Sequence, residues 1–495
     1  MQLPSEHRAV LEACDALAAL PATTLHLVTT YFDTPKAALT AAGFTLRVRS
    51  VGARFIQTAK SHDGDVGLAG NRNEWEWDIA GATPDLSRLG DVPCLASLVA
   101  KIAGALEPMF VTDVRRTVRT AELAEGCVVE VAIDVGTIQA RGKAEPISEL
   151  ELELKAGPPG PMYRLAATLQ AAAPMWLSAE SKATRGWHLR TGQTAAIHLA
   201  TCPKLDAYAD AADGFRDILG AALGHLTANI GPTLRGDPEG LHQMRIALRA
   251  ARATLALFAP SLDTTCVARF DRELQAVCRS FGIARDWDVF CLETLPAAMR
   301  ALPSARLIDL ANVAETSRAA SHHEVDSLIR GPQFTATLLA LAGWAGQASD
   351  DASAKGIAPM GRSLADLAPH LLGIVARKTR KRGRHVTRLS AVRLHRFRKA
   401  LDRLCDDSIV LAALYPHHRV SAYRTRCVAL QGILGAANDA VVAAALGNTL
   451  LVDERPDLLA PLKGFLAWNE ARRTGALVGL KSATKGFRDT IPFWT

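Results

Sequence analysis

Hydrophobic and polar positions alternate with a period of two through most of the N-terminal part of the chain. This spacing is typical of strands that bury one face of a sheet and expose the other. The alternating segments are 25–34, 44–50, 53–60, 74–80, 110–120, 127–135 and 148–156. Helical spacing occurs near 5–20 and in 161–174, and turn-rich stretches occupy 62–73 and 140–146. We therefore predict an α+β region with a largely antiparallel sheet.

The pattern changes near residue 207, beyond which alanine and leucine recur at helical spacing almost to the end of the chain. Polar stretches interrupt this pattern at 235–240, 259–265, 330–333, 346–359 and 455–461. Few segments there alternate as strands do, so we predict an all-α bundle. The predicted division is a sheet domain at 1–191, a linker at 192–205 and a helical domain at 206–495.

Charge is divided unevenly between these two parts. Residues 1–200 carry 19 Lys+Arg against 22 Asp+Glu, a net charge of −3, whereas residues 201–495 carry 38 against 28, a net charge of +10. The densest basic stretch runs from Arg377 to Arg403 and holds twelve Lys or Arg. Such a surface attracts polyanions, which include nucleic acid, anionic lipid and chains of phosphate.

The nine cysteines are scattered and none forms a C-x-x-C pair, which favours free thiols in a reducing cytoplasm over a zinc site. No run of 18 uncharged apolar residues occurs, so we predict no membrane span. The N-terminal segment up to Leu20 mixes charges with apolar positions and is typical of an amphipathic helix rather than a signal peptide. We therefore expect a cytoplasmic protein.

The charged residues of the predicted strands gather on single strand faces. The charged positions of this kind are Arg47 and Arg49, then Glu74 and Glu76, then Glu149, Glu151, Glu153 and Lys155. Each charged face could simply meet solvent, as in most antiparallel sheets. The alternative is a closed barrel with a polar lumen, in which cations hold a phosphate chain and carboxylates hold its divalent metal. Charges on nearly every strand favour the barrel, because burying charges that share no ligand is costly.

Seven motifs occur in an order that resembles the CYTH domain, the triphosphate tunnel family that includes inorganic triphosphatases, thiamine triphosphatases and class IV adenylate cyclases. The motifs are TYFDTP (30–35), FTLRVR (44–49), QTAK (57–60), EWEW (74–77), TDVRR (112–116), SELELEL (148–154) and ESKATRGW (180–187). The resemblance covers about residues 1–190 and implies an eight-stranded antiparallel tunnel. It implies that triphosphate is bound by Arg47, Arg49, Lys60, Arg116 and Lys182. The Mg²⁺ or Mn²⁺ ligands that it implies are Glu74, Glu76, Glu149, Glu151 and Glu153, with Glu130 and Asp134 as weaker candidates.

The CYTH pattern opens on a strand with a glutamate-x-glutamate-x-lysine signature, and no such motif precedes Ser5. Either the natural protein lost this strand or its start codon lies further upstream. Loss of the strand removes two metal-facing carboxylates and a lysine, and it leaves two unpaired sheet edges. We therefore expect substrate binding to survive and efficient hydrolysis to fail, which leaves enzyme activity as an open question.

An internal repeat relates two blocks of the helical region at one constant offset, which takes His242 to His395 and Gly282 to Gly435. LHQMRIALRAARATLALF (241–258) corresponds to LHRFRKALDRLCDDSIVL (394–411), and FGIARDWDVF (281–290) corresponds to LGAANDAVVA (434–443). Asp286 and Asp439 correspond at the same offset. The repeat predicts a duplicated helical unit with pseudo-twofold symmetry. For the Asp-Trp-Asp motif at 286–288, we prefer caps or salt bridges to the cationic helices over a metal site.

The first copy of the repeat places one histidine and three arginines within about one quadrant of a helix: His242, Arg245, Arg249 and Arg252. The second copy gathers His395, Arg398 and Lys399, with Arg403 a turn further and Asp402 in place of the third cation. A lone histidine on a helix is usually a core or capping residue. Its repetition beside cations at one offset favours binding, and two such helices related by a twofold would frame one cationic groove.

These blocks resemble the CHAD domain, the conserved-histidine α-helical domain often found after a CYTH domain in bacteria and archaea. The resemblance covers about residues 206–490 and implies two four-helix bundles around a basic pore that binds inorganic polyphosphate, and association with polyphosphate granules. The ligands that it implies are His242, Arg245, Arg249, Arg252, His395, Arg398, Lys399 and Arg403, to which the basic stretch adds Arg377, Arg380, Lys381 and Arg384. The predicted fold class is an antiparallel α+β tunnel followed by an all-α duplicated four-helix-bundle domain.

Three functions stay open on this evidence. The first is polyphosphate binding by the helical domain, beside a tunnel that binds tripolyphosphate. The second is an active metal-dependent inorganic triphosphatase, and the third is a nucleic-acid-binding module that uses residues 377–388. Aromatic residues make up only 5% of the chain, which disfavours nucleic acid because single-stranded binders stack bases on aromatic rings. The sequence assigns no oligomeric state.

Overall fold

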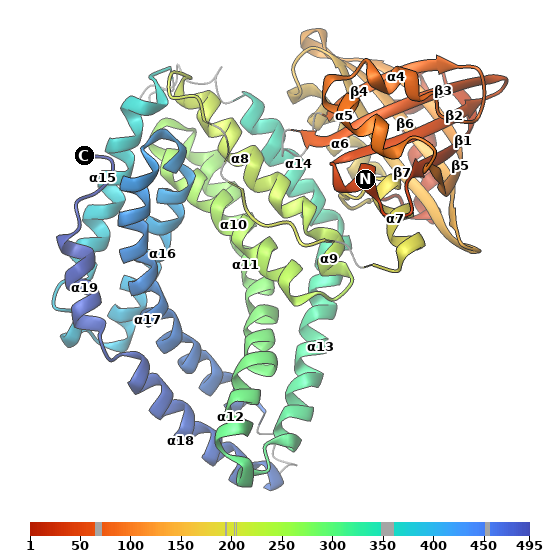
Figure 1. The fold of residues 1–495 in the computed structure, drawn as a ribbon. Helices are drawn as coiled ribbons and strands as arrows, with labels where there is room; N and C mark the ends of the chain where they lie inside the picture. Colours follow the sequence, from red (N-terminus) through yellow and green to blue (C-terminus); the bar gives the residue numbers. More distant parts are fainter. Residues whose placement is uncertain (65–71, 194–195, 202, 204, 348–360, 451–455) are drawn as a thin grey trace. The chain divides into compact units, whose positions relative to one another are not determined.

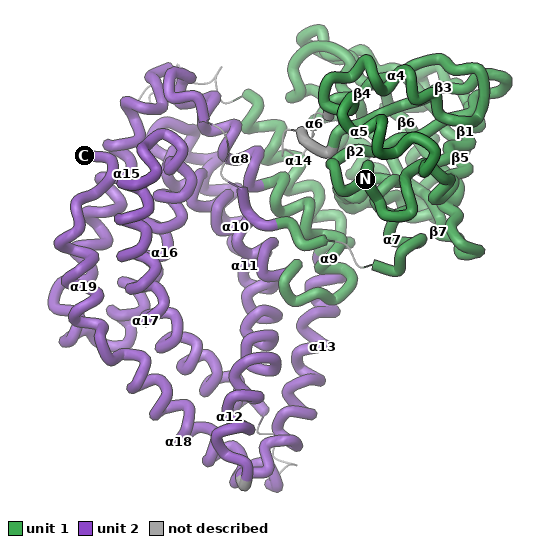
Figure 2. The backbone as a smooth tube through the Cα atoms, in the orientation of Figure 1, with its two compact units in different colours: residues 1–198, 223–240, 329–347 green, residues 199–222, 241–328, 348–495 purple. Residues whose placement is uncertain are grey.

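The structure is a computed structural model of the chain, and it describes every residue except 65–71, 194–195, 202, 204, 348–360 and 451–455. Strands dominate the N-terminal part and helices follow to the C-terminus (Figure 1). The chain divides into two compact units (Figure 2). Unit 1 comprises residues 1–198, 223–240 and 329–347, and unit 2 comprises residues 199–222, 241–328 and 348–495.

Unit 1 is built on a seven-stranded sheet with the order β4-β3-β2-β1-β5-β6-β7, in which every neighbouring pair is antiparallel. The strands are β1 (Thr23–Asp33), β2 (Phe44–Val51), β3 (Arg54–Gly64), β4 (Arg72–Ile79), β5 (Glu107–Glu122), β6 (Val128–Ala140) and β7 (Lys143–Ala156). Each coincides with one of the predicted alternating segments, so the α+β prediction is confirmed. Residues 1–3 pair with β7, where Met1 and Leu150 exchange backbone hydrogen bonds.

Period-two alternation gives the sheet an apolar outer face and a polar inner face. On the outer face, α1 (Arg8–Ala13), α2 (Asp15–Ala18) and α6 (Gly160–Ala172) cover β5, β6 and β7 through a cluster that includes Leu11, Leu17 and Val131. The short α3 (Ala38–Ala41), α4 (Leu86–Gly90) and α5 (Pro93–Ile102) cover β2 to β4 through Leu46, Leu89 and Leu95. Trp75 and Trp77 pack against this second cluster. The predicted ligand residues of these strands, among them Arg47, Arg116 and Glu151, therefore share the inner face.

Four local predictions differ from the structure. The turn predicted at 140–146 is confined to Arg141 and Gly142, both with positive φ, because β7 already begins at Lys143. The first helix is interrupted at Cys14, where ψ is 145°. Helices α4 and α5 lie in a stretch for which no element was predicted. The same is true of α7 (Lys182–Thr191). Of the turn predicted at 62–73, residues 65–71 lie outside the described part of the chain.

Beyond residue 207 the described part of the chain is built mainly from helices, as predicted. They are α8 (Ala211–Ala228), α9 (Ile230–Leu234), α10 (Pro238–Phe258), α11 (Thr264–Val289), a π-helix (Phe290–Thr294), α12 (Leu295–Ala301), α13 (Ile308–Arg330), α14 (Pro332–Gln347), α15 (Leu364–Arg382), α16 (Ala391–Val410), α17 (His417–Thr449), α18 (Leu459–Ala476) and α19 (Leu480–Asp489). The repeated blocks fall on α10 and α11 in the first copy and on α16 and α17 in the second. Both histidines of the repeat lie near the first turns of their helices.

Helix α17 is long and apolar enough to cross a membrane by length and composition alone, which the uninterrupted-run criterion did not detect. This is weak evidence for a span, because a core helix passes the same test. Helix α17 packs against α16, α18 and α19, and it buries Tyr423, Leu430 and Leu434.

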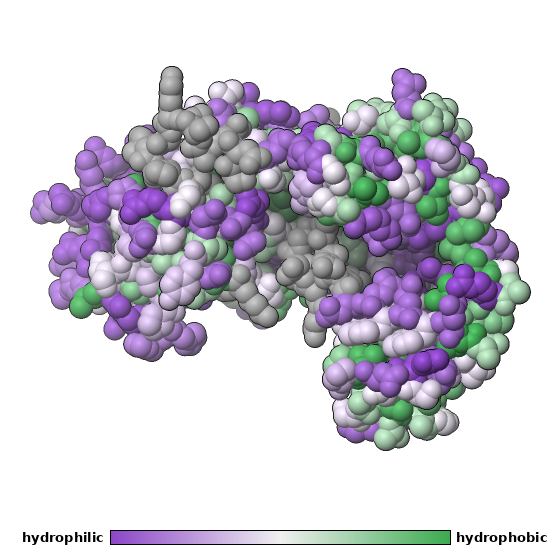
Figure 3. All heavy atoms as spheres, turned by 90° about the horizontal axis from the view of Figure 1, so that it is seen from above, coloured by the Kyte–Doolittle hydropathy of each residue, from purple (hydrophilic) through white to green (hydrophobic). Residues whose placement is uncertain are grey.

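On the face of the molecule in Figure 3, hydrophilic side chains cover much of the surface and apolar ones are interspersed among them.

Candidate functional site

A cationic wall lines the inner face of unit 1 along β2 and β3. Arg47 and Arg49 alternate with outward residues on β2, and Lys60 follows on the neighbouring strand β3. Lys60 Nζ lies 2.7 Å from Glu74, and Arg47 Nη2 lies 3.1 Å from the same carboxylate. Thr58 donates to Glu76 at 3.0 Å. Glu74 and Glu76 are thus held by groups on this wall.

Positive charge is crowded on the cationic wall. Arg49 donates to Thr29 Oγ1 at 3.4 Å and forms no ion pair within 4.0 Å among the described residues. Its burial, together with Arg47 and Arg116 nearby, lowers the pKa of Arg49 to about 10. Burial and Arg47 likewise lower the pKa of Lys60. An anion placed beside these side chains would relieve their mutual repulsion.

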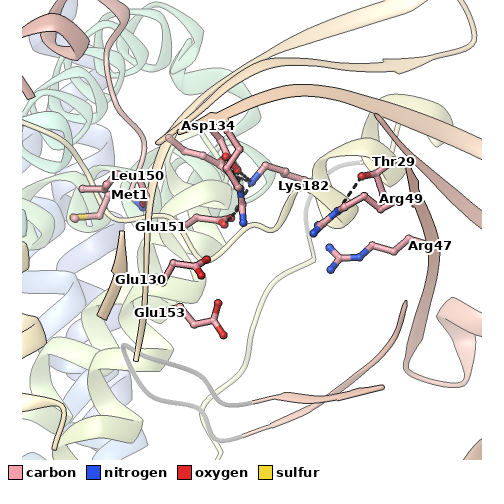
Figure 4. Close-up of polar contacts among 12 residues, drawn as sticks. Met1, Thr29, Arg47, Arg49, Glu130, Asp134, Leu150, Glu151, Glu153 and Lys182 are labelled. Atoms are coloured by element: carbon pink, nitrogen blue, oxygen red, sulfur yellow. Dashed lines mark hydrogen bonds and ion pairs between the residues drawn. The ribbon is translucent and has the colours of Figure 1, made fainter. Parts of the chain in front are cut away.

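An acidic wall faces the cationic one across the inner face (Figure 4). The β5–β6–β7 register aligns Arg116, Asp134 and Glu149 in one row, and Glu151 lies one row further along β7. Arg116 donates to Asp134 Oδ1 at 2.7 Å and to Oδ2 at 2.6 Å, and it also pairs with Glu151. Glu130 and Glu153 point into the same space and share Lys155, at 3.7 and 2.7 Å.

Lys182 lies among the carboxylates of the acidic wall. Its Nζ is 2.7 Å from Asp134 Oδ2 and 2.8 Å from Glu151 Oε1, and it also pairs with Glu149. Burial disfavours the charged amine, but Glu151, Glu149 and Asp134 outweigh burial and raise the pKa of Lys182. Burial opposes ionisation of Glu151 in the same way, and Lys182 with Arg116 reverses the effect and lowers the Glu151 pKa. Lys182 and Glu151 are therefore both ionised at neutral pH.

The donor set of this cluster fits a divalent cation. One oxygen each from Asp134, Glu149 and Glu151 lies within 4.8 Å of the others. Mg²⁺ and Mn²⁺ prefer such carboxylate oxygens. Of the five glutamates predicted as metal ligands, the structure gathers Glu149 and Glu151, and it adds Asp134. Glu74, Glu76 and Glu153 lie apart from this cluster, and all five ligand roles stay predictions.

Helix α7 holds Lys182 in place by filling one end of the inner face with apolar side chains. Ala183, Trp187 and Leu189 of this helix pack against a cluster that contains Tyr31 and Phe110, whose rings stack at 4.5 Å. The same cluster takes inner-face residues from β5, β6 and β7: Val114, Ile138, Ala140 and Ile147. Ser181 caps the helix by accepting a hydrogen bond from the Thr184 N–H. The backbone at Lys182 is consequently anchored on both sides.

The second candidate site lies in unit 2, where the two repeated helices approach one another. Arg249 of α10 forms an ion pair with Asp406 of α16 at 2.7 Å. Arg245 donates to the Gly282 carbonyl at 2.9 Å and lies 3.7 Å from Asp286. Arg398 also interacts electrostatically with Asp286. Arg245 therefore contacts Asp286, whereas Arg398 pairs with Asp402 of its own helix at 3.0 Å and acts on Asp286 only at longer range.

Asp286 and Asp439, which correspond in the repeat, line one small cavity together with Thr294 and Phe290. Burial and the neighbouring Asp439 raise the pKa of Asp286, and burial raises the pKa of Asp439. The interpretation of Asp286 as a salt-bridge partner of a cationic helix is confirmed by Arg245. Asp288 instead pairs with Arg318 and His322, both at 2.8 Å.

The other predicted polyphosphate ligands differ in their surroundings. Arg252 pairs with Asp271 at 2.8 Å, Arg398 with Asp402 at 3.0 Å and Arg403 with Asp407 at 3.5 Å. His395 is exposed, and partial burial together with the adjacent Lys399 and Arg398 lowers its pKa. His242 is half-buried. The assignment of these residues as ligands stays a prediction.

The basic stretch contributes exposed cations at the end of α15. Arg377, Lys381 and Arg384 are exposed and form no ion pair within 4.0 Å in the described part of the chain. Arg380 differs, because its guanidinium donates to the Thr490 carbonyl at 3.0 Å and is partly buried. We therefore expect Arg380 to stabilise the packing of the C-terminal segment, while its binding role stays untested.

One residue of these sites was missed by the sequence analysis and another was underrated. Arg185 is buried and donates to Glu145 at 2.7 Å and to Glu149 at 3.2 Å, yet it was not singled out although it lies in the ESKATRGW motif. Asp134 was named only as a weaker candidate, although it is fully buried beside two cations. The available signal was its even spacing from Glu130, which places both carboxylates on one face of the predicted strand.

Comparison with known proteins finds two domain families along the chain. The CYTH domain model matches residues 2–187, and the CHAD domain model matches residues 217–447. An inorganic triphosphatase of Haemophilus influenzae is 32% identical over 170 residues, which cover 34% of this chain and 47% of that protein. The chain thus spans about half the length of this curated relative.

Among solved structures, the CHAD domain from the plant Ricinus communis is 26% identical to this chain. It superposes with a TM-score of 0.53 over 59% of this chain and 97% of its own length. The two domain models leave Met1 and residues 188–216 and 448–495 uncovered. The chain therefore contains a CYTH domain followed by a CHAD domain.

Proposed function

We propose that the CHAD domain binds inorganic polyphosphate between α10 and α16. The observation that carries the proposal is the ion pair of Arg249 on α10 with Asp406 on α16, together with the cavity that the repeat-related Asp286 and Asp439 line. Two helices that each carry a histidine and several cations thereby face a common region. Arginine forks suit the oxygens of a phosphate chain, which offers charge and no base to stack. The buried position of Phe397 on α16 supports phosphate over nucleic acid.

Competition between polyanions tests this function. The full chain, with fluorescently labelled double-stranded DNA bound at physiological salt, is titrated with long-chain polyphosphate at equal phosphate concentration. We expect polyphosphate to displace the DNA, because the site recognises phosphate without reading bases. DNA that resists displacement would reject the proposal in favour of a nucleic-acid-binding module. Salt dependence is no substitute for this test, since every polyanion shows it. The same function would place the protein at cytoplasmic polyphosphate granules.

We further propose that the CYTH domain binds tripolyphosphate together with Mg²⁺ or Mn²⁺. Arg47, Arg49 and Lys60 supply the cationic wall for the phosphates. Asp134, Glu149 and Glu151 are the residues that would hold the metal, which would neutralise charge on the phosphate oxygens. The similarity to an inorganic triphosphatase supports this substrate class.

Hydrolysis of tripolyphosphate is the second candidate function, and the compact carboxylate cluster favours it. The test is orthophosphate release from tripolyphosphate with Mg²⁺ or Mn²⁺ present. If the chain hydrolyses, Glu151→Gln is expected to abolish release, because Glu151 belongs to the metal-binding cluster. The exposed Glu6→Gln is the matched control with the same loss of charge. Absence of release with retained tripolyphosphate binding would reject hydrolysis and leave binding as the function.

A further inference from the structure

The acidic cluster of the CYTH domain already contains a cation of the chain's own. Lys182 Nζ lies within 2.8 Å of oxygens from Asp134 and Glu151, and it also pairs with Glu149. These are the same three carboxylates whose oxygens fit a divalent cation. A metal ion contacts such oxygens at about 2.1 Å, so an ammonium and a metal cannot both lie at the centre of this set.

The other cations of the cluster approach from its edges. Arg116 pairs with Asp134 and Glu151, and Arg185 pairs with Glu149 from the side of Glu145. Lys182 is the residue that contacts all three carboxylates among the described residues. Its four-carbon side chain can move while its backbone stays fixed, because Ser181 caps α7 and Trp187 with Leu189 anchors the helix in the apolar cluster.

We propose that Lys182 occupies the place of the divalent cation in the substrate-free tunnel and gives it up when the metal arrives with its phosphate chain. The displaced ammonium then turns toward the phosphates, beside Arg47 and Arg49 on the facing wall. This proposal depends on the proposed binding of tripolyphosphate and metal by the CYTH domain. In this proposal Lys182 couples the two ligands. Its ammonium opposes metal binding in the empty tunnel and favours metal binding once phosphate is present.

Mn²⁺ titration followed by electron paramagnetic resonance tests this exchange in the full chain. Without phosphate, Lys182→Met is expected to bind Mn²⁺ about tenfold more tightly than the unsubstituted chain, the equivalent of one charge-assisted contact. Lys155→Met is the matched control, since it removes the same charge from the Glu130 and Glu153 pair nearby. An unchanged Mn²⁺ affinity in Lys182→Met, or an equal gain in Lys155→Met, would overturn the proposal.

A second measurement uses tripolyphosphate with saturating Mn²⁺ in a calorimeter. Lys182→Met is expected to bind the phosphate chain about tenfold more weakly, because it lacks the ammonium that turns toward it. If Lys182→Met does not fold, Lys182→Arg takes its place, because it keeps the positive charge. The Mn²⁺ affinity of Lys182→Arg is expected to stay at or below that of the unsubstituted chain. Tighter Mn²⁺ binding by Lys182→Arg would contradict the competition. If the unsubstituted chain binds no tripolyphosphate, the proposed function is wrong. If it binds tripolyphosphate but its Mn²⁺ affinity is the same with and without Lys182, only the proposed exchange is wrong.

Discussion

Polyphosphate binding is expected to fall by about a hundredfold or more when Arg245 and Arg398 are both replaced by alanine. Each guanidinium makes charge-assisted contacts worth roughly 1.5–3 kcal/mol, so two lost contacts cost about 3 kcal/mol or more. The pair was chosen because the repeat relates the two residues and because each lies three residues beyond the histidine of its copy. An isotherm of the full chain with long-chain polyphosphate measures the effect.

The control for this experiment removes two arginines of unit 2 that lie outside the proposed groove. Arg269→Ala with Arg300→Ala changes the net charge equally, and both side chains are exposed. We expect the control to retain affinity within about threefold, because distant surface charges contribute little at physiological salt. Circular dichroism verifies that both double variants keep their helices. Equal losses in the two variants would mean that affinity follows net charge and that no specific groove exists.

Tripolyphosphate binding is expected to fall by about a hundredfold when Arg47 and Arg49 are both replaced by alanine, again because two charge-assisted contacts are lost. Calorimetry with Mg²⁺ present measures this change. The fold should tolerate the substitution. Burial and neighbouring cations lower the pKa of Arg49, which means that the folded chain disfavours its charge. We therefore expect the thermal midpoint of Arg49→Ala to equal or exceed that of the unsubstituted chain.

Arg54→Ala with Arg88→Ala is the matched control in the same domain. Both side chains are at least half exposed, and their partners Asp78 and Asp85 lie away from the carboxylate cluster. If this control loses as much tripolyphosphate affinity as Arg47→Ala with Arg49→Ala, the cationic wall is not the binding surface. If neither variant loses affinity, tripolyphosphate binds elsewhere on the chain.

The spacing of hydrophobic residues predicted the architecture, because it shows which face of each strand or helix is buried. Seven alternating segments became the seven strands, since a residue's side in a strand depends only on its parity. The constant offset between the repeated blocks identified α10 with α16 and α11 with α17 before any contact was known. Helices α4 and α5 were missed because they are short and have no repeat or motif to mark them.

The partners of charged side chains depended on packing between distant segments. A helical wheel places Arg245, Arg249 and Arg252 together, yet they contact Asp286, Asp406 and Asp271 at separate places on other helices. Lys182 matched a phosphate-binding motif, and its pairing with three carboxylates required α7 to anchor against β5 and β6.

Residue spacing was enough to predict which residues face the inside of the CYTH sheet and which two helices of the CHAD domain are equivalent. Both follow from the spacing of residues along the chain, because the backbone geometry of a strand or helix fixes the direction in which each side chain points. Only the tertiary structure decided that Asp134 joins Glu149 and Glu151, and that Asp286 lies beside Asp439. Such neighbours come from separate elements, and their distances are set by the packing of apolar side chains between those elements.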